Sequence, residues 1–185
     1  MKAKNGINRR RFMQLAAGAV AVGASVSCGK VVSPWRSLSV DEAETLSSLC
    51  GQIIPQDQDA GAVSAGVVNY IDVQLAGRLK RMKKVYRQGI AEMNDVSVKK
   101  YGRRFSGLSD QQQAEFLSAI DGDKEWKGSP LPKFFRIVID HTMQGFYGDP
   151  RHGGNRNRVS WTMLRLPYPP IRGRFRVDDP VAGRE

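Results

Sequence analysis

The segment GDPRHGGNRNRVSW, residues 148–161, concentrates the groups in this chain that could do chemistry. It holds one carboxylate (Asp149), one histidine (His152), three arginines and the pair Gly153 and Gly154. Glycine-rich basic loops bind anions, because backbone N–H groups can converge where no side chain intrudes. His152, Asp149 and the arginines could instead serve a hydrolase or lyase, although no evident nucleophile lies near His152 in the sequence. A surface that contacts a partner is the third interpretation.

Other chemistry is limited by the small number of histidines and cysteines. The two histidines, His141 and His152, lie eleven positions apart, and no cysteine or carboxylate joins them at the spacing of helical zinc ligands. The two cysteines lie 22 positions apart, which excludes the C-x-x-C-H pattern of covalent haem, and no G-x-G-x-x-G turn is present. Cys50 and His141 are expected to be structural residues on helices. The sequence therefore favours a chain without catalytic, cofactor-binding or metal-binding residues of its own.

The first 27 residues have the features of an export signal. A basic start precedes a mildly apolar run from Leu15 to Val26, which is shorter than the ~20 residues that span a bilayer. Around the charges, NRRRFMQ matches the twin-arginine pattern through Arg9, Arg10 and Phe12. The alternative is a basic stretch that leads into an ordinary buried helix. We expect a periplasmic protein that the twin-arginine translocase exports in its folded state.

Cys28 follows the expected signal and is a candidate for lipid attachment. Ser25 and Ser27 are small enough for cleavage before Cys28, but Ser25 stands where the lipoprotein pattern prefers leucine. Membrane anchoring through Cys28 is therefore an open alternative. If Cys28 is acylated, only Cys50 is left as a thiol and no internal disulfide can form.

The net charge falls when the signal is removed. Residues 1–27 contain five basic and no acidic residues, so the formal net charge drops from +11 to +6. No base-reading or stacking motif accompanies this charge, and we expect no nucleic-acid partner. The size of the rest of the chain predicts a single compact domain at 39–161, after a linker at 28–38.

Apolar residues at helical spacing predict an all-α fold of about five helices. Capping-box pairs, Ser39 with Glu42 and Ser109 with Gln112, mark two helix starts, and the Gly-Asp-Pro sequence at 148–150 ends the last helix. The expected helices cover about 39–54, 63–77, 79–93, 109–120 and 133–147. The residues expected to face the core are Leu46, Leu49, Cys50, Ile53, Ile54, Val63, Val67, Ile71, Leu75, Met82, Val85, Tyr86, Ile90, Met93, Phe116, Leu117, Ile120, Phe135, Val138, Ile139, Thr142, Met143 and Phe146.

Two further segments are expected at the surface. The basic run RLKRMKK, 78–84, is expected to be a solvated face that could also meet an acidic partner or anionic lipid. Residues 162–185 contain three prolines in four positions and scattered arginines, which rule out a long helix. We expect an extended, irregular arm there.

The stretch GFYGDPRHGGNRNRVSW resembles the signature of the gluconate 2-dehydrogenase subunit 3 family. The likeness extends over most of the chain after the signal, because LSSLCGQIIPQDQDAGAVSAGVVNYIDVQLAG is similar to the family's helix, Ile-Ile-Pro turn and second helix. After residue 161 the chain has LRLPYPPIRGRF where the family tends to end in a short Gly-Tyr-Pro-Gly sequence, so the path of the arm is open. The matching residues are FLSAID in the middle, then Phe134, Phe135, His141, Asp149, Pro150, Gly153, Gly154, Asn155 and Trp161.

This resemblance implies a non-catalytic small subunit of a periplasmic FAD-dependent sugar or sugar-acid dehydrogenase. The implied partners are a flavoprotein of the glucose-methanol-choline type and, in many complexes, a multihaem cytochrome c, which carry the FAD and the haem. Such flavoproteins commonly lack an export signal, so the small subunit would supply one and stabilise its partner. The residues then expected to contact the flavoprotein are Asp149, Pro150, Arg151, His152, Gly153, Gly154, Asn155 and Trp161.

Three alternatives stand beside this interpretation. Segment 148–161 could merely cap the last helix of its own domain. The chain could be a free-standing exported lipoprotein that acts as a binding module, or an exported hydrolase or lyase that uses His152.

Overall fold

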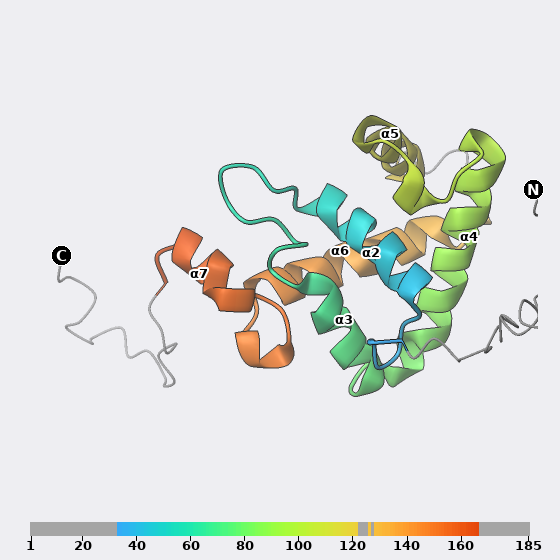
Figure 1. Cartoon of the computed structure of the whole chain (residues 1–185). Helices are drawn as coiled ribbons and strands as arrows, with labels where there is room; N and C mark the ends of the chain where they lie inside the picture. The colour runs from blue at the N-terminus through green and yellow to red at the C-terminus, as the bar shows by residue number, and fades with distance from the viewer. Residues whose placement is uncertain (1–32, 122–125, 127, 167–185) are drawn as a thin grey trace, which may run out of the picture. The chain divides into compact units, whose positions relative to one another are not determined.

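A computed structural model of the chain describes residues 33–121, 126 and 128–166 (Figure 1). The expected export signal with Arg9, Arg10 and Phe12, the candidate lipidation site Cys28 and the expected arm beyond residue 166 lie outside the described residues. The predicted all-α class is confirmed, because the described residues form helices and no strand. The α-helices are α2 (Val40–Ile53), α3 (Val67–Ala76), α4 (Lys83–Tyr101), α5 (Asp110–Asp121), α6 (Leu131–Tyr147) and α7 (Val159–Met163). Short 3-10 turns are η1 (Lys80–Met82), η2 (Phe105–Gly107), η3 (Pro150–His152) and η4 (Arg156–Arg158).

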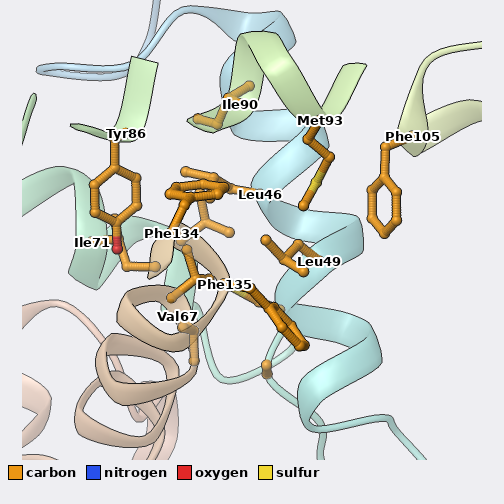
Figure 2. Packing of buried hydrophobic residues seen from close by; sticks show 14 of the residues in the cluster. Leu46, Leu49, Val67, Ile71, Tyr86, Ile90, Met93, Phe105, Phe134 and Phe135 are labelled. Atoms are coloured by element: carbon orange, nitrogen blue, oxygen red, sulfur yellow. The ribbon is translucent and has the colours of Figure 1, made fainter. Parts of the chain in front are cut away.

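Helix α6 is the central element, since it contacts each of the other five α-helices (Figure 1). Its side chains meet those of α2, α3 and α4 in one apolar core (Figure 2). Among the described residues, no helix combines the length and apolarity needed to cross a membrane. The largest side chains with less than 2% exposure are Tyr86, Phe105, Phe116, Phe134, Phe146, Leu46, Leu49, Ile71, Leu75, Met93, Ile120 and Leu131.

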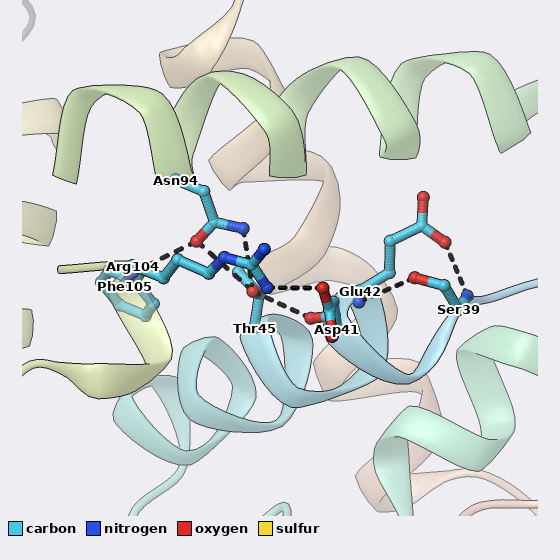
Figure 3. Close-up of polar contacts among 7 residues, drawn as sticks. All are labelled: Ser39, Asp41, Glu42, Thr45, Asn94, Arg104 and Phe105. Atoms are coloured by element: carbon cyan, nitrogen blue, oxygen red, sulfur yellow. Dashed lines mark hydrogen bonds and ion pairs between the residues drawn. The ribbon is translucent and has the colours of Figure 1, made fainter. Parts of the chain in front are cut away.

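The start of α2 has the predicted capping box. The Ser39 N–H donates to Glu42 Oε2 at 2.7 Å, and the Glu42 N–H donates to Ser39 Oγ at 3.1 Å (Figure 3). The same end of α2 is joined to α4 by a hydrogen bond from Asn94 Nδ2 to Thr45 Oγ1 at 3.1 Å. The two capping-box bonds satisfy backbone donors that a helix start leaves without intrahelical partners.

Helix α3 starts later than predicted. Gly66 has φ +72° and precedes the first helical residue, Val67. This left-handed conformation interrupts the predicted helix, so Val63 lies in the preceding turn and is 53% exposed. The prediction that Val63 faces the core was wrong, whereas Ile71 and Leu75 are buried as expected.

Helix α4 is longer than predicted. It continues beyond Met93 to Tyr101 and ends at Gly102, which has φ +72° and supplies the left-handed cap. No glycine or proline interrupts the chain between Met93 and Gly102. The expected start at Leu79 was also early, because η1 separates Leu79 from α4.

The buried face of α6 differs from the prediction at two positions. Met143 was expected inside but is 42% exposed, and Phe134, which was not assigned to the core, is 1% exposed. Phe134 packs edge-on against Tyr86 with ring centroids 5.6 Å apart. Gly89 on α4 makes room for it, because a Cβ at Gly89 would lie 2.2 Å from the Phe134 ring. The close approach of α4 at Gly89 therefore accommodates the inner position of Phe134.

The chain after α6 contains more helix than predicted. Tyr147 ends α6 and Gly148 caps it, as expected. Helix α7 then brings the number of α-helices in the described residues to six, compared with the five predicted, and runs to Met163. The first two residues of the expected arm are therefore helical.

Candidate functional site

Segment 148–161 satisfies the C-terminal end of α6. The last carbonyls of a helix have no intrahelical donor, so other groups must satisfy them. Ser160 Oγ donates to the Phe146 carbonyl at 2.6 Å, and Trp161 Nε1 donates to the Tyr147 carbonyl at 2.8 Å. Asn155 Nδ2 donates to the Gly148 carbonyl at 3.0 Å. Three side chains of the segment thus cap three successive carbonyls.

Asn155 holds the centre of this cap. It is fully buried, and its Oδ1 accepts the Ser160 N–H at 3.1 Å while its Nδ2 donates to the end of α6. Its φ of +42° is in the left-handed region, which asparagine tolerates better than most residues. Asn157 and Arg158 also have positive φ, at 57° and 60°. The segment is therefore a tightly wound structure with fixed internal bonds.

The two adjacent glycines have different roles. Gly153 has φ +98°, so it needs the conformational freedom of glycine. Gly154 lacks a positive φ, but a Cβ there would lie 2.1 Å from the Gly145 carbonyl oxygen on α6. Close backbone contact with the chain's own helix thus explains Gly154.

Two hydrogen bonds join the segment to α3. Asn69 Nδ2 donates to the Gly153 carbonyl at 2.7 Å. The Arg156 N–H donates to the Ala65 carbonyl, just before α3, at 2.9 Å. The segment therefore connects α6 with α3, and Gly154, Asn155 and Trp161 are buried within the chain itself.

The outer face of the segment holds Asp149, Arg151 and His152. The Asp149 carboxylate accepts the Arg151 N–H at 3.0 Å and forms an ion pair with the Arg151 guanidinium. Hydrogen bonds from the Arg151 side chain, then from its backbone N–H, lower the pKa of Asp149 to about 2. Arg151 and His152 are exposed, and no hydrogen bond joins the His152 ring to another described residue. Whether this face contacts a partner stays a prediction.

His152 borders a cavity of about 320 Å³ between the segment and α3. Tyr70, Gln74 and Arg78 form its other side. Tyr70 and Gln74 follow at one-turn spacing along α3, and Arg78 continues that spacing just beyond its end. Tyr70 is fixed by a hydrogen bond from its hydroxyl to Gln144 Oε1 on α6, at 3.0 Å. The fold thus places His152 opposite Tyr70, Gln74 and Arg78, which the sequence alone did not connect with it.

His141 lies on α6, away from the cavity beside His152, and its ring is hydrogen-bonded to Tyr86 inside the domain. The Tyr86 hydroxyl and His141 Nδ1 are 2.7 Å apart. Desolvation by burial lowers the pKa of His141, Asp140 raises it, and Arg78 lowers it further. Burial raises the pKa of Tyr86, so its hydroxyl keeps the proton and donates to the neutral ring. His141 and His152 therefore do not share a site.

Cys50 is fully buried and inert, as the sequence predicted. Burial raises the pKa of its thiol to about 12, with an opposing effect from Thr142 Oγ1, which donates to Cys50 Sγ at 3.3 Å. A thiol is a nucleophile only as the thiolate. Among the described residues, no group of three or more histidine, cysteine, aspartate or glutamate side chains could hold a metal ion.

One buried charged residue, Asp72 on α3, was not predicted to have a role. It is 2% exposed, and its carboxylate accepts the N–H groups of Arg36, Ser37 and Leu38 at 2.8, 2.8 and 3.1 Å. It thereby fixes the chain just before α2. The available signal was a lone aspartate in the otherwise uncharged helix sequence VVNYIDVQLA.

Comparison with known proteins supports the family that the sequence of segment 148–161 resembles. No curated protein and no solved structure matches the chain. The family model for gluconate 2-dehydrogenase subunit 3 matches residues 40–167, which include all six α-helices and the capping segment of α6. This chain belongs to the gluconate 2-dehydrogenase subunit 3 family.

Proposed function

We propose that this chain is the non-catalytic small subunit of a periplasmic FAD-dependent sugar or sugar-acid dehydrogenase. Its twin-arginine signal, Arg9, Arg10 and Phe12, carries a signal-less flavoprotein of the glucose-methanol-choline type across the membrane, and its folded domain stabilises that flavoprotein. A multihaem cytochrome c accepts the electrons. The family match over residues 40–167 carries this proposal, because it makes the chain a dehydrogenase subunit.

The chemistry of the described side chains supports a role without catalysis. Asp149 is paired with Arg151, and His141 is paired with Tyr86. Cys50 is buried and protonated at neutral pH. Among the described residues, no hydroxyl or thiol is hydrogen-bonded to the His152 ring, as it would be in a histidine-activated nucleophile. The binding-module and hydrolase alternatives gain no specific support from these contacts.

The proposed flavoprotein contact is the outer face of segment 148–161, and the inner face holds it in place. Pro150, Arg151 and His152 form the turn η3 on the outside. Tyr147 and Met143, at one-turn spacing near the end of α6, are 43% and 42% exposed and add apolar surface to the end of the helix that precedes this turn. Aromatic, methionine and arginine side chains are enriched at interfaces. Gly154, Asn155 and Trp161 contribute by fixing the backbone beneath this face.

Purification of the tagged full chain from its native host tests the complex. We expect a second chain with the visible absorbance of a flavin to co-purify. A chain that is recovered alone, without flavin or haem absorbance, would contradict the proposal.

A second experiment tests export. The double substitution Arg9→Lys and Arg10→Lys should leave both subunits in the cytoplasm, because only one chain carries the signal. Cell fractionation with a flavin-dependent activity assay measures this, and Lys2→Arg with Lys4→Arg is the matched control. Normal periplasmic activity in the double variant would overturn the co-export part of the proposal.

A further inference from the structure

The cavity beside His152 is lined by cationic and neutral polar groups. Tyr70, Gln74 and Arg78 form one wall and His152 the other, around about 320 Å³. Tyr70 is held by Gln144, so this wall is fixed before anything binds. The cavity thus has one wall that is fixed by Tyr70. Two exposed side chains with nitrogen donors, Arg78 and His152, also line it.

No described carboxylate lines this cavity, and the two carboxylates on the elements that form it have partners within the domain. Asp149 pairs with Arg151, and Asp72 accepts three backbone N–H groups. No hydrogen bond or ion pair joins the Arg78 guanidinium to another described residue. Its charge acts on His141, whose pKa it lowers, while Asp140 acts on that ring in the opposite direction. Among the described residues, Asp140 is the carboxylate that shares this neighbourhood, and it forms no ion pair with Arg78.

Arg78 also begins the basic run 78–84. Arg78, Lys80, Arg81 and Lys84 are exposed and Lys83 is half-buried, and none of the five forms an ion pair within the described part of the chain. The ion pairs seen there use other cations, Arg87, Arg104 and Arg151. Unpaired like charges in one short run repel one another, and an opposite charge relieves that repulsion. The run and the cavity are continuous through Arg78.

We propose that this surface is the docking site for an acidic segment of the partner flavoprotein. One carboxylate of that segment enters the cavity between Arg78 and His152, and its other acidic residues lie along Lys80, Arg81 and Lys84. A concave site that admits one carboxylate suits a side chain on a protein better than a flat anionic membrane. This inference rests on the proposed function and adds a second contact surface to it.

Neutralising Arg78 in the complex tests the proposal. The tagged full chain with Arg78→Gln is purified from the native host beside Arg103→Gln as the matched control. Arg103 is exposed and follows the far end of α4, roughly 28 Å away for 19 residues at 1.5 Å each. We expect about tenfold less flavoprotein with Arg78→Gln at about 150 mM salt, less than twofold loss with Arg103→Gln, and a smaller difference between the two variants at high salt, which screens the charges.

Zero-length carbodiimide coupling of the wild-type complex tests the same contact without a substitution, so its result does not depend on whether a variant folds. It should join Lys80 or Lys84 to aspartate or glutamate of the flavoprotein, as read by peptide mass spectrometry. Flavoprotein that co-purifies equally with both variants, and no such cross-link, would overturn this inference while the proposed function stands. Wild-type chain that brings no flavoprotein would overturn both. Binding to phosphatidylglycerol vesicles that is lost in Arg78→Gln, with a normal complex, would overturn it in favour of a membrane surface.

Discussion

The two irregular ends of the described domain are fixed in opposite ways. Before α2, one carboxylate on α3, Asp72, accepts three consecutive backbone N–H groups. After α6, three side chains, Asn155, Ser160 and Trp161, each donate to one of three consecutive carbonyls. Before α2, one carboxylate serves three N–H donors. After α6, each of three carbonyl acceptors has a side-chain donor of its own.

This difference decides how each end fails. A single substitution at Asp72 removes the partners of three N–H groups together, and a buried unsatisfied donor costs about 1–3 kcal/mol. At the end of α6, a substitution of Ser160 or Trp161 leaves the other two caps in place, whereas Asn155 also accepts the Ser160 N–H. We therefore expect a single substitution of Asp72 to lower the free energy of unfolding strongly. After α6 we expect a strong loss only from a substitution that displaces the backbone.

Asp72→Ala should have the largest effect. We expect a loss of about 3–5 kcal/mol in the free energy of unfolding, because three N–H groups lose a charged acceptor. Asp72→Asn is the matched control and should lose less, since an amide oxygen at the Oδ1 position still accepts from Ser37 and Leu38. Urea unfolding followed by circular dichroism measures both. Equal losses for the two variants would contradict the account of Asp72 as a shared acceptor.

Gly154→Val should come next, at about 2–3 kcal/mol. Its Cβ would overlap the Gly145 carbonyl at 2.1 Å and push the capping segment away from α6. Gly102→Ala is a useful comparison, because Gly102 has φ +72° and open space around its Cβ position. It should cost only about 1–2 kcal/mol from backbone strain. If Gly154→Val melts at the wild-type temperature but fails to bind the flavoprotein, Gly154 contacts the partner rather than its own helix.

Trp161→Phe should have a smaller effect, about 1 kcal/mol. It keeps the aromatic packing and removes one donor of three, leaving the Tyr147 carbonyl to accept from water. A shift of about 2–4 °C in melting temperature is expected for a domain of this size. A loss as large as that of Asp72→Ala would show that the three caps act as one unit.

The smallest effect concerns pH and Asp149. Its pKa falls from 3.8 to about 2 in the folded chain, so the stabilisation is present above pH 4 and is lost as pH falls toward 2. Asp149→Asn should remove this part of the acid sensitivity, with a small drop in melting temperature at pH 7 and a smaller one at pH 2.5. Melting curves at pH 2.5 and pH 7 for wild type and variant test it. An identical pH dependence in both would rule out the Asp149–Arg151 pair as its source.

Local sequence patterns predicted the regular parts of this fold well. The capping boxes at Ser39 and Ser109 are both formed, and Leu46, Leu49 and Cys50 are buried. These features depend on neighbours within one turn, which periodicity captures. The late start of α3 at Gly66 depends on backbone conformation instead, and glycine permits a left-handed residue without requiring one.

Features that depend on distant residues were not predicted. Phe134 takes an inner position because Gly89, 45 positions earlier, leaves space for its ring. The partners of Asp72 lie 34 to 36 positions away, and those of Asn69 lie 84 away. The order of residues in 148–161 indicated the family that the family model shows. Only the fold shows that Asn155 and Gly154 are buried while Arg151 and His152 are exposed.

The burial of Cys50 turns one thiol into a reporter of core opening. At a pKa of about 12, roughly one thiol in 10⁵ is ionised at pH 7, and no solvent reaches it in the closed domain. A soluble thiol reagent can therefore react only with molecules in which α2 has separated from α6. The reaction rate of a chain in which Cys28 is replaced by serine would count those openings directly, and a bound partner that holds the two helices together would slow it.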